Sequence, residues 1–256
     1  MRADQLLVER GLAASRSQAQ RLIAAGVQWF DGQAWKRVAK NGDELPAAAP
    51  LELLDTAESR YVSRGGLKLE GALRAAGLDV TGWTCLDVGQ STGGFTDCLL
   101  QHGAARVTGV DVGHGQLHPK LRQDRRVVAI EKLNARELDA QQVGGGFDLV
   151  TGDLSFISLT LVLPALVPLL KAGVPAATQP AGGHLLMLAK PQFELQPAQI
   201  GKGGVLRDAA LYPVVEQRLR DACAALGLQV TGWYDSPIAG GDGNREFFLH
   251  AQTRSH

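Results

Sequence analysis

Four charged residues occupy positions from which they could activate a hydroxyl group. In the predicted order of elements, Asp153 ends one strand, Lys190 ends the next and Glu246 opens the last. The carboxyl ends of parallel strands share one edge of a sheet, and Lys68, on the helix entering the same domain, could reach that edge. A hydroxyl is a weak nucleophile at neutral pH, and a lysine can serve as its base when desolvation or a neighbouring cation helps the lysine lose its own proton. The set therefore indicates a catalytic site in which carboxylates position the lysines; a structural ion-pair network is the alternative.

A turn containing three glycines lies beside these residues in the predicted fold. The apolar run at residues 85–88 indicates a buried strand, and a turn with Gly89, Gly93 and Gly94 leads into a helix. Glycines let the backbone approach a ligand where a Cβ would clash, so the turn is expected to form the floor of a pocket. No Gly-Lys-Ser/Thr follows, which excludes a Walker A loop, and the spacing does not fit G-x-G-x-x-G. A tight strand-to-helix turn without a ligand is the alternative.

Two aspartates near this turn indicate what the ligand carries. Asp87 lies inside the strand end, where its charge would repel a pyrophosphate but suits a cationic or hydroxyl-bearing group. Asp111 ends the next strand, where a carboxylate can hydrogen-bond ribose hydroxyls. Together they suggest S-adenosylmethionine, with its ribose on Asp111 and its methionine end near Asp87 and Gly89. The candidate cofactor-binding residues are Asp87, Gly89, Ser91, Gly93, Gly94, Phe95, Asp111, Asn134 and Asp153.

Alternating strands and helices are predicted to position both groups of residues. Ser63 is the predicted N-cap of a helix that runs to about Ala76, and segment 173–182 is predicted to be an inserted loop. The alternation predicts an α/β, Rossmann-like fold whose sheet is mostly parallel with an antiparallel edge. Strands are predicted at 85–88, 107–110, 127–133, 147–153 and 185–188, followed by a closing hairpin at 228–234 and 246–251. Helices are predicted at 95–102, 159–170 and 209–226.

The first 40 residues predict a small α+β unit with a basic surface. Helices are expected at 5–9 and 17–25, the second capped by Ser15, and a hairpin at 27–38 turns at residues 31–32. A compact basic face suits phosphate backbones, and an ordinary solvated face explains the same charges equally well. Between residues 10 and 40 a single acid, Asp31, accompanies six basic residues: Arg10, Arg16, Arg21, Lys36, Arg37 and Lys40.

A segment rich in alanine, proline and polar residues separates this unit from the α/β domain. It covers residues 46–50 and 55–59. The predicted boundaries are 1–58 for the N-terminal domain, 59–64 for an interdomain linker and 65–256 for the α/β domain.

Composition restricts the classes of protein to consider. The 256 residues include 26 lysines and arginines against 26 acids, so any nucleic-acid surface must be local. The three cysteines have no paired or metal-like spacing, which fits a reducing cytoplasm and predicts no metal site. No signal peptide is expected, and the longest apolar run, 159–170, is too short to span a bilayer. A membrane protein is therefore not expected.

The N-terminal sequence closely resembles an S4 RNA-binding domain. The resemblance covers about residues 1–55 and rests on the pattern Leu-Val-Glu-Arg-Gly-Leu, then Ser-Arg and Gly, within residues 2–26. Residues 42–45 match the closing turn and strand of that domain. The acidic and alanine-rich stretch 43–50 departs from the pattern and adds no basic contacts. The resemblance implies that this domain binds RNA.

The remaining sequence resembles the FtsJ-type ribose 2′-O-methyltransferases. An S4 domain followed by an FtsJ-type domain is the architecture of the TlyA family, also called hemolysin A, and the match runs nearly end to end. The matched blocks are Ser-Arg-Gly-Gly-Leu-Lys at 63–68, Ser-Thr-Gly-Gly-Phe-Thr-Asp at 91–97, Asp-Leu-Ser-Phe-Ile-Ser at 153–158, Lys-Pro-Gln-Phe-Glu at 190–194, Gly-Lys-Gly-Gly-Val at 201–205 and Gly-Asn-Arg-Glu-Phe-Phe at 243–248.

This resemblance implies a role for each of the four charged residues. The Lys-Asp-Lys-Glu tetrad of these enzymes corresponds to Lys68, Asp153, Lys190 and Glu246, with Lys190 as the lysine that deprotonates the hydroxyl. It also implies S-adenosylmethionine as methyl donor and cytidine 2′-hydroxyls of ribosomal RNA, in one or both ribosomal subunits, as substrate. Arg64, in the first matched block, joins the candidate RNA-binding residues. No protein partner is required by the sequence.

Two features depart from the family pattern. Gln90 replaces a residue that is usually small, and is expected to narrow the cofactor pocket without abolishing binding. The insertion at 173–182 is expected to alter the rim that faces the substrate.

Three other functions are less well supported. A membrane-lytic protein, as the hemolysin name suggests, would need a spanning or strongly amphipathic segment, which the sequence lacks. A non-catalytic RNA-binding assembly factor would be expected to have lost a tetrad residue, and none is lost. Methylation of a base is disfavoured because the sequence has neither an Asn/Asp-Pro-Pro-Tyr motif nor a catalytic cysteine loop.

Overall fold

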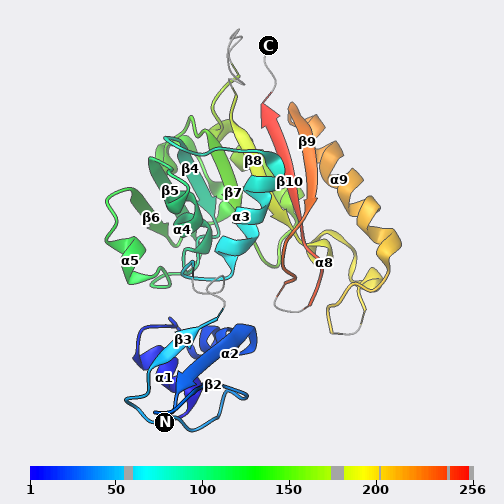
Figure 1. Ribbon diagram of the computed structural model, residues 1–256. Coiled ribbons are helices and arrows are strands. Elements are labelled where there is room, and N and C mark those ends of the chain that lie inside the picture. Colours follow the sequence, from blue (N-terminus) through cyan, green and yellow to red (C-terminus); the bar gives the residue numbers. More distant parts are fainter. Residues whose placement is uncertain (55–59, 174–181, 202, 241–242, 254–256) are drawn as a thin grey trace. The chain divides into compact units, whose positions relative to one another are not determined.

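The computed structural model describes residues 1–54, 60–173, 182–201, 203–240 and 243–253. Within them the chain forms two compact units, Met1–Leu67 and Lys68–His256 (Figure 1). Ser59 of the predicted linker and residues 174–181 of the predicted insertion lie outside the described residues.

Two helices pack against a three-stranded antiparallel sheet in the N-terminal unit. The helices are α1 (Ala3–Glu9) and α2 (Arg16–Gly26), and the sheet, in the order β2-β1-β3, contains β1 (Val27–Phe30), β2 (Trp35–Arg37) and β3 (Leu51–Leu53). As predicted, Ser15 caps α2, because its Oγ accepts a hydrogen bond from the Gln18 backbone N at 3.2 Å. The core includes Leu6, Leu7, Leu22, Ile23 and Val27.

The third strand of this sheet differs from the prediction. It pairs with β1 at Leu51–Leu53, inside a stretch whose composition resembles a domain boundary. The predicted closing strand at 42–45 contributes only an isolated bridge between Arg2 and Glu44. Leu51 and Leu53 pack against the core while Glu52 between them is exposed, so the signal for β3 is an alternation only three residues long.

A seven-stranded sheet forms the centre of the second unit. Its order is β6-β5-β4-β7-β8-β10-β9 (Figure 1). The strands are β4 (Thr84–Val88), β5 (Arg106–Asp111), β6 (Val127–Glu131), β7 (Leu149–Gly152), β8 (His184–Ala189), β9 (Leu228–Asp235) and β10 (Phe247–Thr253).

As predicted, the closing hairpin of β9 and β10 forms an antiparallel edge of the mostly parallel sheet. Within this hairpin, β10 is the inner strand. β10 pairs antiparallel with β8 on one side and with β9 on the other, and β9 is the edge strand. The first five residues of β10 are all buried, whereas the burial of β9 is interrupted along its length. A strand that is apolar on both faces is stable only where it is covered on both faces, and this explains the inner position of β10.

Helices cover both faces of the sheet. α3 (Gly65–Ala76) and α4 (Gly94–Gln101) lie on one face and α9 (Tyr212–Ala225) on the other (Figure 1). α7 (Leu163–Leu166) shares a hydrophobic core with α9. α3 begins at Gly65 and not directly after Ser63, the predicted N-cap. The remaining short helices are α5 (Pro119–Arg122), α6 (Ala140–Val143) and α8 (Pro191–Glu194), with 3-10 turns η2 (Ala135–Glu137), η3 (Leu159–Leu161), η4 (Val167–Leu169), η5 (Pro197–Gln199) and η6 (Ala209–Leu211).

The helix predicted at 159–170 is broken into three short pieces, η3, α7 and η4. Pro164 lies at the start of α7 and Pro168 at the start of η4. Proline has no amide hydrogen and its ring clashes with the preceding turn, so a continuous helix cannot pass through these positions. The apolar residues of the segment, including Leu163 and Leu166, are nevertheless buried against the sheet.

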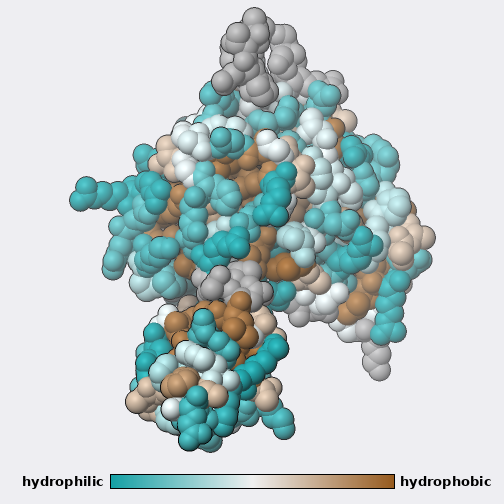
Figure 2. Space-filling view, in the orientation of Figure 1, coloured by the Kyte–Doolittle hydropathy of each residue, from teal (hydrophilic) through white to brown (hydrophobic). Residues whose placement is uncertain are grey.

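In the described part of the chain, no helix combines the length and apolar character needed to cross a membrane. The same residues include no group of three histidine, cysteine or acidic side chains arranged to hold a metal ion. On the face drawn in Figure 2, hydrophilic residues are interspersed among the hydrophobic ones.

Candidate active site

The four charged residues singled out from the sequence lie in one continuous chain of contacts. Lys190 Nζ is 2.6 Å from Asp153 Oδ1. Lys68 Nζ is 3.8 Å from the other oxygen of Asp153 and 2.6 Å from Glu246 Oε2. The order Glu246–Lys68–Asp153–Lys190 therefore alternates in charge from end to end.

The topology of the sheet explains why these residues meet. Asp153 directly follows β7 and Lys190 directly follows β8, so both lie at the carboxyl edge of parallel neighbours. Glu246 precedes β10, and because β10 runs in the opposite direction its beginning lies at the same edge. Lys68 lies one turn into α3.

Three of the four side chains are largely buried. Lys68 and Lys190 are each 10% exposed and Glu246 is 3% exposed, whereas Asp153 is 26% exposed. A buried ion pair gains stability only if its charges are well matched, and the 2.6 Å contact between Lys68 and Glu246 meets that condition. Lys190 also donates a hydrogen bond to Ser155 Oγ at 2.9 Å, which helps to fix the position of its amine.

A pocket of about 440 Å³ opens beside Lys190 and Glu246. Phe156 stands at this pocket with 89% of its surface exposed, and its ring is 5.1 Å from that of Phe193. Its φ of +63° is uncommon for a bulky residue, and such strain is found mostly at functional sites. The pocket is lined by Ser155, Phe156, Lys190, Gln192, Phe193, Ile200, Gly203, Gly204 and Glu246.

The aromatic residues of this pocket were not predicted as functional residues from the sequence. Phe156 and Phe193 both belong to matched blocks, three residues after Asp153 and Lys190 respectively. An aromatic residue at the same distance beyond two catalytic strand ends is a signal that could have identified them.

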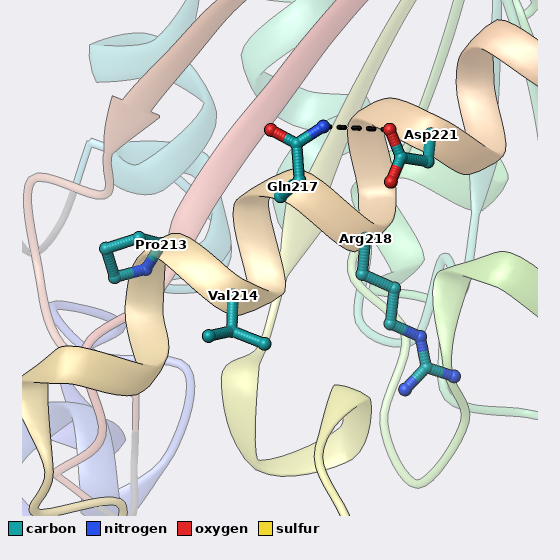
Figure 3. Close-up of a pocket in the computed structure, with 5 residues that line it drawn as sticks. All are labelled: Pro213, Val214, Gln217, Arg218 and Asp221. Atoms are coloured by element: carbon teal, nitrogen blue, oxygen red, sulfur yellow. Dashed lines mark hydrogen bonds between the residues drawn. The ribbon is translucent and has the colours of Figure 1, made fainter.

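A second, more open pocket of about 570 Å³ lies along α9 (Figure 3). All of its lining residues belong to that helix, and none belongs to the charged chain. They are Pro213, Val214, Gln217, Arg218 and Asp221.

At two positions of the turn after β4, neighbouring protein atoms leave no room for a side chain, so glycine is needed there whether or not a ligand is bound. Gly89 has φ +82°, and a Cβ there would lie 2.9 Å from the carbonyl oxygen of Asp153. Gly93 has φ +96°, and a Cβ there would lie 2.3 Å from a methyl carbon of Leu121. The prediction that glycines make room for a ligand is therefore incomplete, because at these two positions the space is filled from β7 and α5.

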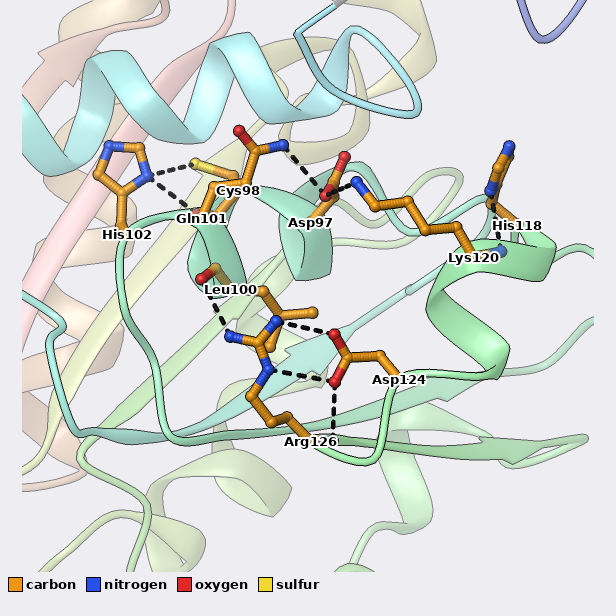
Figure 4. Close-up of polar contacts among 9 residues, drawn as sticks. All are labelled: Asp97, Cys98, Leu100, Gln101, His102, His118, Lys120, Asp124 and Arg126. Carbon is orange, nitrogen blue, oxygen red and sulfur yellow. Dashed lines mark hydrogen bonds and ion pairs between the residues drawn. The ribbon is translucent and has the colours of Figure 1, made fainter. Parts of the chain in front are cut away.

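Polar contacts hold the segment after β5 against α4 (Figure 4). Asp97 of α4 accepts a hydrogen bond from Gln101 Nε2 at 3.1 Å and lies 3.4 Å from Lys120 Nζ of α5. Arg126 donates to the Leu100 carbonyl at 3.3 Å. These contacts fix the turns after β4 and β5 relative to each other.

Asp87 has one oxygen that no described residue satisfies. It is 1% exposed, and its Oδ2 accepts a hydrogen bond from Thr96 Oγ1 at 2.7 Å, while Oδ1 is buried without a hydrogen-bond partner in the described structure. The pKa of Asp87 is raised to about 7, mainly by burial and to a smaller extent by the negative charges of Asp153 and Asp111, while hydrogen bonds from Thr96 oppose the rise. A buried acceptor without a partner is costly, so this oxygen suits a ligand that supplies a donor or a positive charge.

Asp111 uses part of its carboxylate to shape the turn. Its Oδ2 accepts from the Ser91 backbone N and its Oδ1 from the Gly113 backbone N, both at 2.7 Å. Ser91 has φ +48°, a strained conformation that this bond helps to maintain. Each carboxylate oxygen has a second lone pair, so ribose hydroxyls remain possible partners.

Two other candidate cofactor residues, Phe95 and Asn134, make contacts within the protein. The Phe95 side chain is a core residue, 4% exposed, and its ring stacks on Phe248 at 6.1 Å. This ring therefore contributes to the core between α4 and the sheet. Asn134 is exposed, and its side chain caps η2 by accepting from the Arg136 backbone N at 3.0 Å.

The Gln90 side chain is directed into the protein. It is 6% exposed, and its Nε2 donates to Thr96 Oγ1 at 2.9 Å. It packs over Gly109 of β5, where a Cβ would come within 1.9 Å of Gln90 Nε2. The structure therefore does not support a narrowed pocket: a larger side chain is accommodated because β5 carries a glycine beneath it.

The six basic residues of the N-terminal unit differ in their surroundings. Lys36 and Arg37 are successive residues of β2, so their side chains leave the sheet on opposite sides. Lys36 lies 2.5 Å from Asp31, and the hydrogen bond from Lys36 is the main reason that the pKa of Asp31 is far below its ordinary value. Arg16 lies 3.0 Å from Asp4, whose carboxylate is fully buried.

The other candidate RNA-binding residues lie at separate places along the chain. Arg10 follows α1 and donates to the Ala47 carbonyl, and Arg21 of α2 donates to the Ser17 carbonyl at 3.1 Å. Lys40 is exposed in the turn after β2, and Arg64 is half-buried just before α3.

Known proteins share this sequence and fold. The FtsJ-like methyltransferase family matches residues 61–253. A solved structure from Streptococcus thermophilus, whose description carries the word hemolysin, superposes with a TM-score of 0.74 and is 40% identical, covering 100% of this chain and 89% of that one.

Two curated relatives match nearly the full length. The 16S/23S rRNA (cytidine-2′-O)-methyltransferase TlyA of Mycobacterium tuberculosis is 44% identical over 254 residues, which are 99% of this chain and 90% of that protein. Hemolysin A of Brachyspira hyodysenteriae is 36% identical over 251 residues, which are 98% of this chain and 99% of that protein. The resemblance to the FtsJ-type methyltransferases and the TlyA family is thus confirmed, and the chain belongs to the FtsJ-like methyltransferases and, within them, to the TlyA family.

Proposed function

We propose that this protein transfers a methyl group from S-adenosylmethionine to the ribose 2′-hydroxyl of a cytidine in ribosomal RNA. The observation that carries the proposal is the alternating chain Glu246–Lys68–Asp153–Lys190, which ends beside a pocket of about 440 Å³. The M. tuberculosis relative is named for the same reaction on 16S and 23S rRNA.

Residues at the ends of β4 and β5 fit the methyl donor. The unsatisfied oxygen of Asp87 suits the cationic methionine end, and Asp111 suits the ribose hydroxyls. S-adenosylmethionine supplies a methyl carbon bonded to a sulfonium, which leaves as a neutral thioether.

Lys190 acts as the general base in this proposal. Its neutral amine takes the hydroxyl proton, and the electron pair left on the oxygen forms the new bond to the methyl carbon. The resulting ammonium lies 2.6 Å from Asp153, whose carboxylate stabilises it. Lys68 and Glu246 hold Asp153 in place, and the positive charge of Lys68 balances one of the two carboxylates.

The N-terminal unit is proposed to be an S4-type domain that binds the RNA backbone, and the protein is proposed to act on ribosomal RNA in the cytoplasm. Relatives that carry the hemolysin name raise a membrane-lytic activity as a second candidate. All four charged residues are present and in contact, which favours catalysis over lysis and over a purely structural RNA-binding role. A liposome-leakage assay at concentrations that saturate methyl transfer should release no dye.

The product should carry its methyl group on a ribose oxygen. Ribosomal subunits methylated with labelled donor would be digested with nuclease and analysed by mass spectrometry. A 2′-O-methyl group protects the adjacent phosphodiester from alkali, because the free 2′-oxygen is the nucleophile in that cleavage. The proposed function would be refuted if the labelled methyl group were found on the base and the adjacent phosphodiester were cleaved by alkali.

Replacement of Phe156 by alanine should weaken use of the RNA and not binding of the donor. An exposed aromatic ring beside the pocket can stack on the base of the target nucleotide, and such stacking contributes about 1–3 kcal/mol. We expect the KM for RNA to rise about tenfold, with the Kd for S-adenosylmethionine unchanged by calorimetry. Val214→Ala, which also removes an exposed apolar side chain, is the matched control. Equal effects of the two variants would contradict this role.

A further inference from the structure

Two chain segments carry the ion pair between Lys190 and Asp153. One continues from β7 through Asp153 to η3, and the other continues from β8 through Lys190 into α8. The first is a loop of irregular backbone, which has no regular hydrogen-bond ladder of its own to fix its position. We infer that Glu194 is a positioning residue that fastens these segments together and so sets the contact between Lys190 and Asp153.

The side chain of Glu194 bonds directly to the opposite segment. Its Oε1 accepts a hydrogen bond from the Leu159 backbone N at 2.7 Å, and its Oε2 accepts one from Ser158 Oγ at 2.5 Å. Ser158 is the N-cap of η3, so the carboxylate takes up the first free amide of that turn together with the capping hydroxyl. The two segments are therefore joined at two places, by Glu194 with Ser158 and Leu159 and by Lys190 with Asp153.

Burial makes these bonds necessary. Glu194 is 2% exposed, and burial raises the pKa of its carboxyl while the bonds from Ser158 and Leu159 oppose the rise. A buried carboxylate without hydrogen bonds is costly in free energy. Movement of the segment after Asp153 would break both bonds to Glu194, and this cost opposes the movement. Neither the reaction nor the pocket uses this residue, although it ends the matched block that begins with Lys190.

α9 supports Glu194 from behind. Arg218 extends away from that helix (Figure 3) and donates a hydrogen bond to the Glu194 carbonyl oxygen. Its positive charge also favours the ionised carboxylate. α9 thus holds the backbone of α8, and Glu194, the last residue of α8, holds the segment after β7.

The inference rests on the proposed role of Lys190 as base, and three variants of the full chain test it. Glu194→Gln keeps an acceptor for Leu159 and a group that can hydrogen-bond Ser158, Glu194→Ala loses both bonds, and Ser158→Ala loses one. Glu216→Ala, which removes a glutamate paired with Arg220 on α9, is the control. Thermal melting identifies variants that do not fold. Hydrogen exchange at the Leu159 amide reports, without any activity measurement, whether the Glu194 side chain still binds Ser158 and Leu159, a pair of contacts that we call the clamp.

We expect kcat to fall at least 30-fold in Glu194→Ala, about fivefold in Ser158→Ala and less than threefold in Glu194→Gln, with the Kd for S-adenosylmethionine within threefold of wild type in all. Lys190 would also lose its close carboxylate in Glu194→Ala, so the pH dependence of kcat should change in that variant. The Leu159 amide should exchange faster in Glu194→Ala only.

The inference is overturned if folded Glu194→Ala keeps its kcat and pH profile, or if Glu194→Gln is as impaired as Glu194→Ala. If Glu194→Ala does not fold, Ser158→Ala decides: an unchanged kcat and pH profile overturns the inference. A wild-type protein that methylates no ribose would instead contradict the proposed function, and the exchange of Leu159 would still report whether the clamp exists.

Discussion

Replacing Lys190 with alanine should reduce kcat by about 10²–10⁴-fold, the range that general-base catalysis contributes. The Kd for S-adenosylmethionine should change less than threefold, because Asp87 and Asp111, which fit the donor, lie at the ends of β4 and β5. Single-turnover rates with ribosomal subunits and calorimetry with the donor alone would measure the two effects.

The Lys190→Arg variant distinguishes a role of residue 190 as a base from a role as a positive charge. Arginine keeps a positive charge beside Asp153 but cannot give up its proton at physiological pH. If Lys190 is the base, the arginine variant should be as inactive as the alanine variant. Activity in the arginine variant within tenfold of wild type would mean that residue 190 acts only through its charge, and another base would have to be sought.

Reversing the charges of Arg37 and Lys40 should weaken RNA binding more than any other pair in the N-terminal unit. Both side chains are exposed, whereas Arg16 and Lys36 are held by Asp4 and Asp31. For Arg37→Glu with Lys40→Glu we expect at least a tenfold rise in the Kd for ribosomal RNA at 0.1 M salt. Each lost phosphate contact removes about 0.7–0.9 from the slope of log K against log salt, so the slope should fall by about 1.4–1.8.

Arg220→Glu, a charge reversal at a surface ion pair on α9, is the matched control for this variant. Its Kd should stay within threefold of wild type. Filter binding at four salt concentrations would supply both the affinities and the slopes. A double variant that binds as tightly as Arg220→Glu would remove Arg37 and Lys40 from the RNA surface.

The sequence was sufficient to predict which charged residues meet. Parallel strands place their carboxyl ends at one edge, so Asp153 and Lys190 could be brought together from strand order alone. Glu246 was harder, because its position depends on β10 lying inside the sheet and running against its neighbours. That arrangement is decided by burial on both faces of β10, which a hairpin signal does not reveal.

Other features of the site could not be predicted because they depend on contacts between residues that are distant in the chain. The space beneath Gln90 exists only because Gly109 lies on the adjacent strand, and Phe95 belongs to the core because Phe248 lies beneath it. No local pattern encodes either neighbour. The break at Pro164 and Pro168 was different, because both prolines are visible in the sequence and should have outweighed the apolar periodicity.

The inner position of β10 has a consequence for how the protein is made. Lys68 is buried against Glu246, which follows it by 178 positions in the chain. At about 5–20 residues per second, a ribosome needs roughly 10–35 seconds to translate that interval. During this time Lys68 has no Glu246 to pair with, and β8 exposes an unpaired edge where β10 will insert. A nascent chain therefore cannot assemble this site, and catalytic competence is acquired only when the last strand of the sheet has been synthesised.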